Sequence, residues 1–252
     1  VEALINAGSL SYFLHDYEQA INFYYRANEI ECDNFYIWFN LANALCEVKK
    51  YDSAFKYYQK SLNLHKDDFL VLNAIGLMYQ DMENYIQAKI YYRKAINHSP
   101  KNSEGYMNMA GVFMKTDCFE NALQNYLKAF ELDKTDSKIP LCIANAYSSL
   151  KNFEMADKYF DITEKIEPFS AKGFICKGLS YSDRGDEDNA ILCYQKAAEL
   201  DTQSPNAYIL TGNIYNSKKD YDNALKYYQK ANDISPNVSS IMVLCANVNV
   251  LK

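Results

Sequence analysis

The sequence predicts an all-α solenoid made of antiparallel helix pairs, and three periodic observations support this fold class. An alanine recurs every 34 residues, a small residue stands twelve positions before each alanine, and an aromatic residue stands four positions after it. The alanines are Ala20, Ala54, Ala88, Ala122, Ala156, Ala190 and Ala224. A regular period of this length is typical of proteins that stack one small helical unit on the next.

The first half of each period predicts a helix with a small residue at its centre. These residues are Gly8, Ala42, Gly76, Ala110, Ala144, Gly178 and Gly212, and Ala246 continues the series into a partial eighth unit. Because the distance between packed helices depends on the side chains at their contact, a small residue allows a second helix to approach closely.

The second half of each period predicts a helix with a stripe of small, aromatic and small residues at i, i+4 and i+7, which share one face. After the periodic alanine, the aromatic residues are Tyr24, Tyr58, Tyr92, Tyr126, Phe160, Tyr194 and Tyr228. The second small residues are Ala27, Ser61, Ala95, Ala129, Thr163, Ala197 and Ala231. We therefore expect each aromatic ring to lie buried between small neighbours.

The segments between these stretches predict turns. Short polar pieces such as Lys49-Lys50 separate the two helices of a unit, and Gly185 is the only glycine in a turn of this kind. Proline follows three of the second helices, at Pro100, Pro168 and Pro236. Pro140 departs from the pattern, because it stands where other units have a helical aromatic residue. We expect Ser137 to cap this helix, which places Pro140 in the first turn, where its missing donor costs little.

The repeated pattern resembles the tetratricopeptide repeat over the whole chain. In the best matching unit the family positions are filled by Trp38, Leu41, Ala42, Leu45, Tyr51, Ala54 and Tyr58. The resemblance implies a single array over residues 1–252, wound into a right-handed superhelix whose first helices line a concave groove. Its repeats are expected at residues 1–34, 35–68, 69–102, 103–136, 137–170, 171–204 and 205–238, followed by a partial repeat at residues 239–252.

Charge and composition argue against several classes of function. The formal net charge is −6 and no strong basic stripe occurs, whereas a nucleic-acid groove needs clustered Lys and Arg. No run approaches 18 apolar residues, so we expect no membrane partner. Seven cysteines without a CxxC pair favour buried thiols over a disulfide or zinc site, and they predict a reducing, cytoplasmic compartment.

The sequence does not predict a catalytic site. His15, His65 and His98 fall at a turn or at helix ends in different units, and no Gly-rich phosphate loop is present. We therefore expect a protein that is not an enzyme, with no catalytic residue, no metal site and no cofactor.

The resemblance implies that the second, fifth, sixth, ninth, twelfth and thirteenth residues of each unit face the groove. Asparagine recurs at two of these positions, and its amide can donate to and accept from a peptide backbone. This looks like the asparagine ladder in the repeat arm of O-linked N-acetylglucosamine transferase. Asparagine is also abundant here and ordinary on an exposed helix, so both interpretations stay open. The candidate groove residues are Asn6, Asn40, Asn43, Asn108, Asn145 and Asn213, together with Tyr36.

Three functions fit these observations. We favour a non-catalytic scaffold that binds an extended or helical segment of a partner protein in the concave groove. The alternatives are the substrate-selecting arm of a larger enzyme, such as an O-linked N-acetylglucosamine transferase, and a self-associating structural array. Residues 241–251 predict a helix that is apolar nearly all round, so we also expect either a piece of a longer array or a contact between this helix and another chain.

Overall fold

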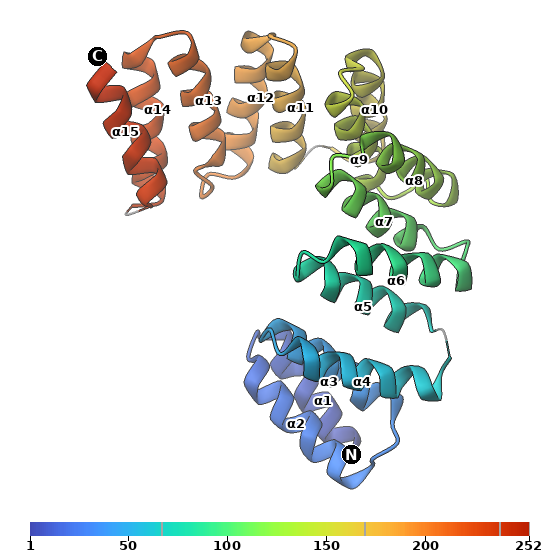
Figure 1. Ribbon diagram of the computed structural model, residues 1–252. Helices are drawn as coiled ribbons and strands as arrows, with labels where there is room; N and C mark the ends of the chain where they lie inside the picture. Colours follow the sequence, from blue (N-terminus) through green and yellow to red (C-terminus); the bar gives the residue numbers. More distant parts are fainter. Residues whose placement is uncertain (67, 169, 237, 252) are drawn as a thin grey trace. The chain divides into compact units, whose positions relative to one another are not determined.

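The computed structural model describes residues 1–66, 68–168, 170–236 and 238–251. Within these residues the regular structure consists of fifteen helices in succession, without a strand (Figure 1). The prediction of an all-α fold made of helix pairs is therefore confirmed. Lys252, the last residue of the predicted array, lies outside the described residues. In each pair we call the first helix A and the second helix B.

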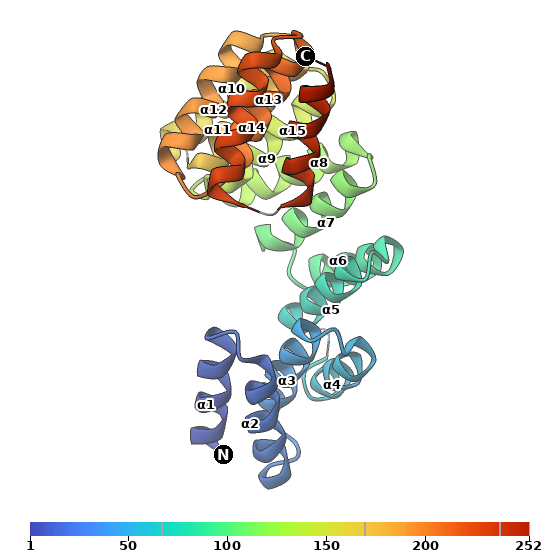
Figure 2. The ribbon, with the colours of Figure 1, turned by 90° about the vertical axis from the view of Figure 1, so that its left-hand side faces the viewer.

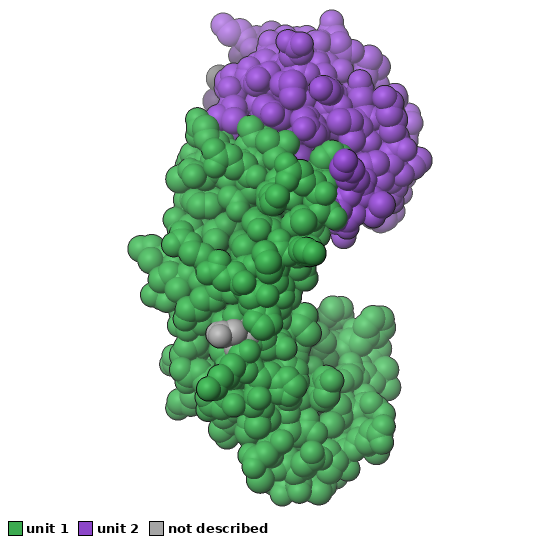
Figure 3. Space-filling model, turned by 90° about the vertical axis from the view of Figure 1, so that its right-hand side faces the viewer, with its two compact units in different colours: residues 1–132 green, residues 133–252 purple. Residues whose placement is uncertain are grey.

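Unit 1 comprises Val1–Leu132 and contains four helix pairs (Figure 3, green). Its A helices are α1 (Glu2–Phe13), α3 (Phe35–Glu47), α5 (Phe69–Asp81) and α7 (Ser103–Lys115). Its B helices are α2 (Tyr17–Ile30), α4 (Tyr51–Leu64), α6 (Tyr85–His98) and α8 (Phe119–Leu132). Each A helix packs against the B helix that follows, and α2, α4 and α6 also contact the next A helix (Figure 2).

Unit 2 comprises Asp133–Lys252 and contains three helix pairs and one further helix (Figure 3, purple). The A helices are α9 (Lys138–Ser149), α11 (Ala171–Asp183) and α13 (Asn206–Ser217). The B helices are α10 (Phe153–Ile166), α12 (Glu187–Leu200) and α14 (Tyr221–Ile234), and α15 (Ser239–Leu251) packs against α14. The single array over residues 1–252 stays a prediction, because each unit is described by itself.

In each helix pair, the aromatic side chain four residues after the periodic alanine of helix B lies at the centre of the packing. All seven rings at this position are buried, and so are the small residues on either side of them. A Cβ atom added to Gly8 would lie 2.6 Å from a ring carbon of Tyr24, and one added to Gly212 would lie 2.6 Å from Tyr228. The small residue of helix A thus makes room for the ring, which confirms the expected packing.

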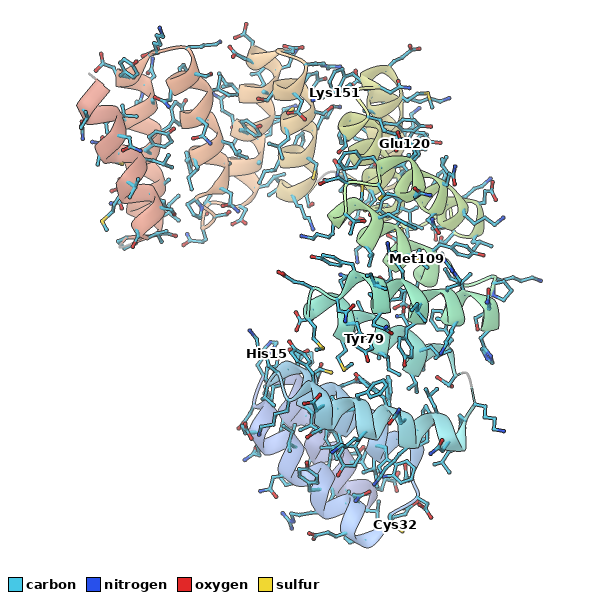
Figure 4. All side chains as sticks on the ribbon, viewed as in Figure 1. His15, Cys32, Tyr79, Met109, Glu120 and Lys151 are labelled. Carbon is cyan, nitrogen blue, oxygen red and sulfur yellow. The ribbon has the colours of Figure 1, made fainter. Side chains whose placement is uncertain are left out.

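Each turn from helix A to helix B contains one left-handed residue. The φ angle is 62° at His15 and 59° at Lys151, both labelled in Figure 4, and 82° at Gly185. The equivalent residues of the other turns are Lys49, Glu83, Asp117 and Lys219, with φ angles of 59°, 57°, 54° and 60°. Because a Cβ atom disfavours this conformation, Gly185 is the residue best suited to the turn.

The expected cap at Ser137 is wrong. The Ser137 side chain makes no capping bond and instead donates its hydroxyl to Glu167 Oε2 at 2.6 Å. Ser137 already has helical angles, and Asp136 Oδ1 accepts from the Lys138 backbone N–H at 2.9 Å. The preceding acid satisfies the helix start, and Pro140 lies in the first turn as expected.

Candidate functional site

A hollow of about 830 Å³ lies on unit 1, and most of its lining comes from A helices. Helices α1 and α3 contribute Tyr12, Phe39, Asn43, Cys46 and Glu47, and α5 and α7 contribute Leu70, Asn73, Ala74, Leu77, Met78, Gln80, Asp81, Glu104 and Lys115. Lys49, Tyr58, Glu83 and Tyr85 complete the lining. All of these A-helix residues except Met78 stand at the six positions where the family resemblance places groove residues.

The hollow has an apolar part built mainly by α5. Phe39, Ala74 and Met78 lie in it, and Leu70 and Leu77 are 54% and 44% exposed. Leucine side chains left this open can bury further area when another apolar group covers them. The hollow can therefore accommodate an apolar side chain of a ligand.

Three carboxylates in the hollow are held in place by neutral donors from neighbouring repeats. The Tyr12 hydroxyl donates to Glu47 Oε1 at 3.0 Å, and Asn73 Nδ2 donates to Glu104 Oε1 at 2.9 Å. The Tyr51 hydroxyl donates to Asp81 Oδ2. This bond raises the pKa of Tyr51 to about 12, and burial raises the pKa of Tyr12, so both hydroxyls keep their protons at neutral pH.

The charges in the lining do not balance. The lining contains four carboxylates and two ammonium groups. The carboxylates belong to Glu47, Asp81, Glu83 and Glu104, and the ammonium groups belong to Lys49 and Lys115. In the part of the chain that the structure describes, none of these six side chains belongs to an ion pair. The hollow is therefore negatively charged, and its acids are available to a cation.

Among the predicted groove residues, Asn43 lines the hollow. Its Oδ1 accepts from the Tyr58 hydroxyl at 2.6 Å, and Asn213 of unit 2 accepts in the same way from Tyr228 at 2.7 Å. In each case the amide oxygen satisfies a buried hydroxyl, which would otherwise be costly. The amide NH₂ groups of these two residues donate to no group in these bonds and can reach a ligand.

Asn108 takes part in a bonded chain that reaches the hollow. Its Nδ2 donates to Asn73 Oδ1 at 2.8 Å, and Asn73 in turn donates to Glu104. Asn73 is only 4% exposed and was not predicted as a site residue. The sequence contains one signal for Asn73. It is a polar residue at the fifth position of its repeat, where the neighbouring repeats have the apolar residues Phe39 and Met107.

The remaining candidates are not brought into the hollow. Asn6 and Tyr36 are exposed on α1 and α3, and Asn40 is half-buried on α3. Asn145 lies on α9 of unit 2, where Phe160 offers no hydroxyl. The structure therefore groups Asn43, Asn73 and Asn108 in unit 1 and leaves the other amides separate.

The described residues contain no group of three His, Cys, Asp or Glu side chains that could hold a metal ion. Burial raises the pKa of the Cys46 thiol to about 11, so this sulfur is protonated and a poor nucleophile at neutral pH. None of the described helices combines the length and apolar character needed to cross a membrane.

The chain matches known families along most of its length. Two models described as tetratricopeptide repeat match residues 1–33 and 33–101. A Sel1 repeat model matches residues 105–134, and a model of anaphase-promoting complex, cyclosome, subunit 3 matches residues 183–250. No curated protein matches the sequence.

Several solved structures share the fold. A tetratricopeptide repeat protein from Parabacteroides merdae is 18% identical, with a TM-score of 0.78 over 98% of both chains. The structure of the APC/C hetero-tetramer Cut9-Hcn1 is 16% identical, with a TM-score of 0.67 over 98% of this chain and 49% of that chain. YrrB, described as a repeat protein with an unusual peptide-binding site, is 22% identical, with a TM-score of 0.55 over 71% and 92%.

Proposed function

The chain is a tetratricopeptide-repeat protein, and we propose that it is a non-catalytic scaffold that binds a segment of a partner protein in the hollow of unit 1. The observation that carries this proposal is the hollow itself, with its apolar part beside fixed polar groups. Binding sites typically place polar groups beside an apolar surface. Arrays of repeats commonly use such surfaces to bind extended ligands.

The amides have a narrower role in this proposal than in the asparagine ladder. Asn43 can donate its NH₂ group to a carbonyl of the bound segment, while its oxygen stays with Tyr58. Asn108 can accept through its oxygen, while its NH₂ group stays with Asn73. Replacing Asn43 or Asn108 with Ala is therefore expected to weaken both binding and folding.

The matches to proteins of multisubunit assemblies support a scaffold. The Cut9-Hcn1 structure and the anaphase-promoting complex model both describe subunits of one large complex. We accordingly favour a role inside an assembly over the substrate-selecting arm of an enzyme. A reducing, cytoplasmic compartment suits the protein, because the seven cysteines of the described residues are thiols rather than disulfides and Cys32 is exposed.

Binding to an unbiased peptide array tests this proposal. The purified protein is expected to bind a subset of peptides, and Leu77→Arg should abolish that binding, because it fills the apolar part of the hollow with a charged side chain. Circular dichroism of the variant checks that its helices remain. Equal binding by the wild type and Leu77→Arg would exclude the hollow as the site.

Self-association through α15 is a second candidate. Val243 and Val250 are 55% and 86% exposed on this helix, and exposed apolar patches mark interaction surfaces. The double substitution Val243→Glu and Val250→Glu should shift the protein to a monomer if α15 joins two copies. Light scattering measures the mass, and an unchanged mass would contradict this contact.

A further inference from the structure

Two acids mark the ends of the stretch of α5 from Asn73 to Asp81. Asp81 is the last residue of α5, and Glu47 occupies the same position in the preceding repeat. Glu104 of α7 is bonded to Asn73, which lies eight residues before Asp81. At 1.5 Å per helical residue, about 12 Å of helix separates Asn73 from Asp81.

An apolar surface separates these ends. Ala74 and Leu77 lie between Asn73 and Asp81 on α5, and both line the hollow. Leu77 is the open side chain among them. The order along α5 is thus Asn73 with its bonded Glu104, the exposed Leu77, and Asp81.

The acids are fixed but not neutralised. Tyr12, Tyr51 and Asn73 orient them with neutral hydrogen bonds, so no internal ion pair needs to break when a ligand cation arrives. Lys49 and Lys115 also line the hollow, but neither is paired with these acids in the described residues. A positively charged ligand is therefore complementary, and an acidic peptide or a nucleic acid is not.

The spacing fits an extended chain. Four residues of a strand span about 13 Å, and the side chains at i, i+2 and i+4 point to the same side. We infer that the hollow binds an extended segment with Lys or Arg at i and i+4 and an apolar residue at i+2. This inference rests on the proposed function and adds the chemistry of the partner segment to it.

A designed peptide tests the inference with the full chain. The probe is a fluorescein-labelled peptide, Gly-Ser-Ser-Lys-Ser-Leu-Ser-Lys-Ser-Ser-Gly, and binding is measured by fluorescence anisotropy. We expect saturable binding that weakens as salt increases, because screening acts on exposed charges. Replacing both lysines of the probe with glutamate should weaken binding at least about tenfold.

Isosteric variants of the protein separate charge from structure. Asp81→Asn and Glu104→Gln keep an oxygen acceptor for Tyr51 and Asn73 but remove the negative charge. Each should weaken binding of the probe about three- to tenfold. Asp183→Asn is the matched control, because Asp183 has the same place at the end of α11 but does not line the hollow.

The outcomes distinguish this inference from the proposed function. Probe binding that is weakened by both isosteric variants and unchanged in Asp183→Asn supports a basic partner. If the glutamate peptide or an uncharged array peptide binds better and Leu77→Arg removes that binding, the basic segment is wrong and the scaffold stands. If neither the probe nor any array peptide binds, both proposals fail.

Discussion

The two units share one scaffold and differ in the chemistry of their A helices. At the end of the A helices, unit 1 has two acids in succession, Glu47 and Asp81, whereas in unit 2 the single acid Asp183 stands between Ser149 and Ser217. At the second position of the repeat, unit 1 has Glu104 and unit 2 has Lys138 and Lys172. The packing positions repeat because every pair must seat an aromatic ring, whereas the surface positions are free to vary. The two units therefore differ at surface positions of the repeat and agree at its packing positions.

The packing itself also differs in one hydrogen bond. In unit 1 the ring of α4 is Tyr58, which donates to Asn43, while in unit 2 the ring of α10 is Phe160, which cannot donate to Asn145. Tyr228 and Asn213 restore the bond later in unit 2. The same amide is therefore bonded to the aromatic residue of its pair in some repeats and not in another.

The largest expected effect tests whether the units unfold together. Ala122 in unit 1 and Ala190 in unit 2 are fully buried, so an aspartate at either place should destabilise the protein by at least about 3 kcal/mol. In a single cooperative array, both Ala122→Asp and Ala190→Asp lower one common melting transition, measured by circular dichroism. Two transitions, of which each substitution moves only one, would reject the single array.

The next effect tests the tyrosine–asparagine bond. Tyr58→Phe should destabilise the protein by about 1 kcal/mol, because a buried hydroxyl bonded to Asn43 is lost. Phe160→Tyr should act in the opposite direction by a similar amount, since the new hydroxyl can reach Asn145. Urea unfolding measures both changes. If Phe160→Tyr is destabilising, Asn145 is not placed like Asn43.

The turns provide a smaller difference between the units. A Cβ atom on Gly185 would meet no atom within 4 Å, so Gly185→Ala tests backbone strain alone and should cost about 1 kcal/mol. Lys49→Gly at the equivalent turn of unit 1 should be neutral or stabilising, because relief of strain offsets the added chain entropy. Thermal unfolding compares the two. A stabilising Gly185→Ala would show that the left-handed turn is not maintained.

The smallest effect is the response to acid. Hydrogen bonds from Asn189 and Asn223 lower the pKa of Asp186 and Asp220, which are the N-cap residues of α12 and α14 in unit 2. A lowered folded-state pKa gives stability that is present above the unfolded pKa, near 3.9, and is lost as the pH falls through the folded value. The melting temperature should therefore fall between about pH 5 and pH 3.

The control for this prediction is the double variant Asp186→Asn and Asp220→Asn. Asparagine keeps a capping oxygen but cannot titrate at this pH. The variant should show a shallower fall in melting temperature than the wild type. The same fall in both proteins would place the acid sensitivity elsewhere.

Periodicity predicted the parts of the fold that depend on the identity of buried residues. The alanine, the ring and the small residue before it, such as Ala54, Tyr58 and Ala42, are buried as expected. The turn conformation could not be read in this way, because Lys49 and Gly185 adopt the same left-handed angle with different side chains. The cap at Asp136 instead of Ser137 is a shift of one residue, which local pattern alone does not resolve.

The site was less predictable than the fold. The family resemblance indicated the positions that line the hollow, but it could not show which polar groups are already bonded to one another. In the sequence, Asn73 is a polar residue at a position that is apolar in other repeats. It links Asn108 to Glu104 only when α5 and α7 pack together. Such cross-repeat bonds depend on packed neighbours, and single-sequence periodicity does not contain them.

Hydrogen bonds within a helix pair join residues that are close in the sequence, and this affects how the chain folds while the ribosome makes it. The bonds from Tyr58 to Asn43 and from Tyr228 to Asn213 each join residues 15 apart. Chains rich in such local contacts fold quickly. At 5–20 residues per second, a ribosome releases one repeat in about two to seven seconds, and the helix pair can close before the next repeat emerges. The nascent chain is therefore expected to fold pair by pair, with little apolar surface waiting for a distant partner.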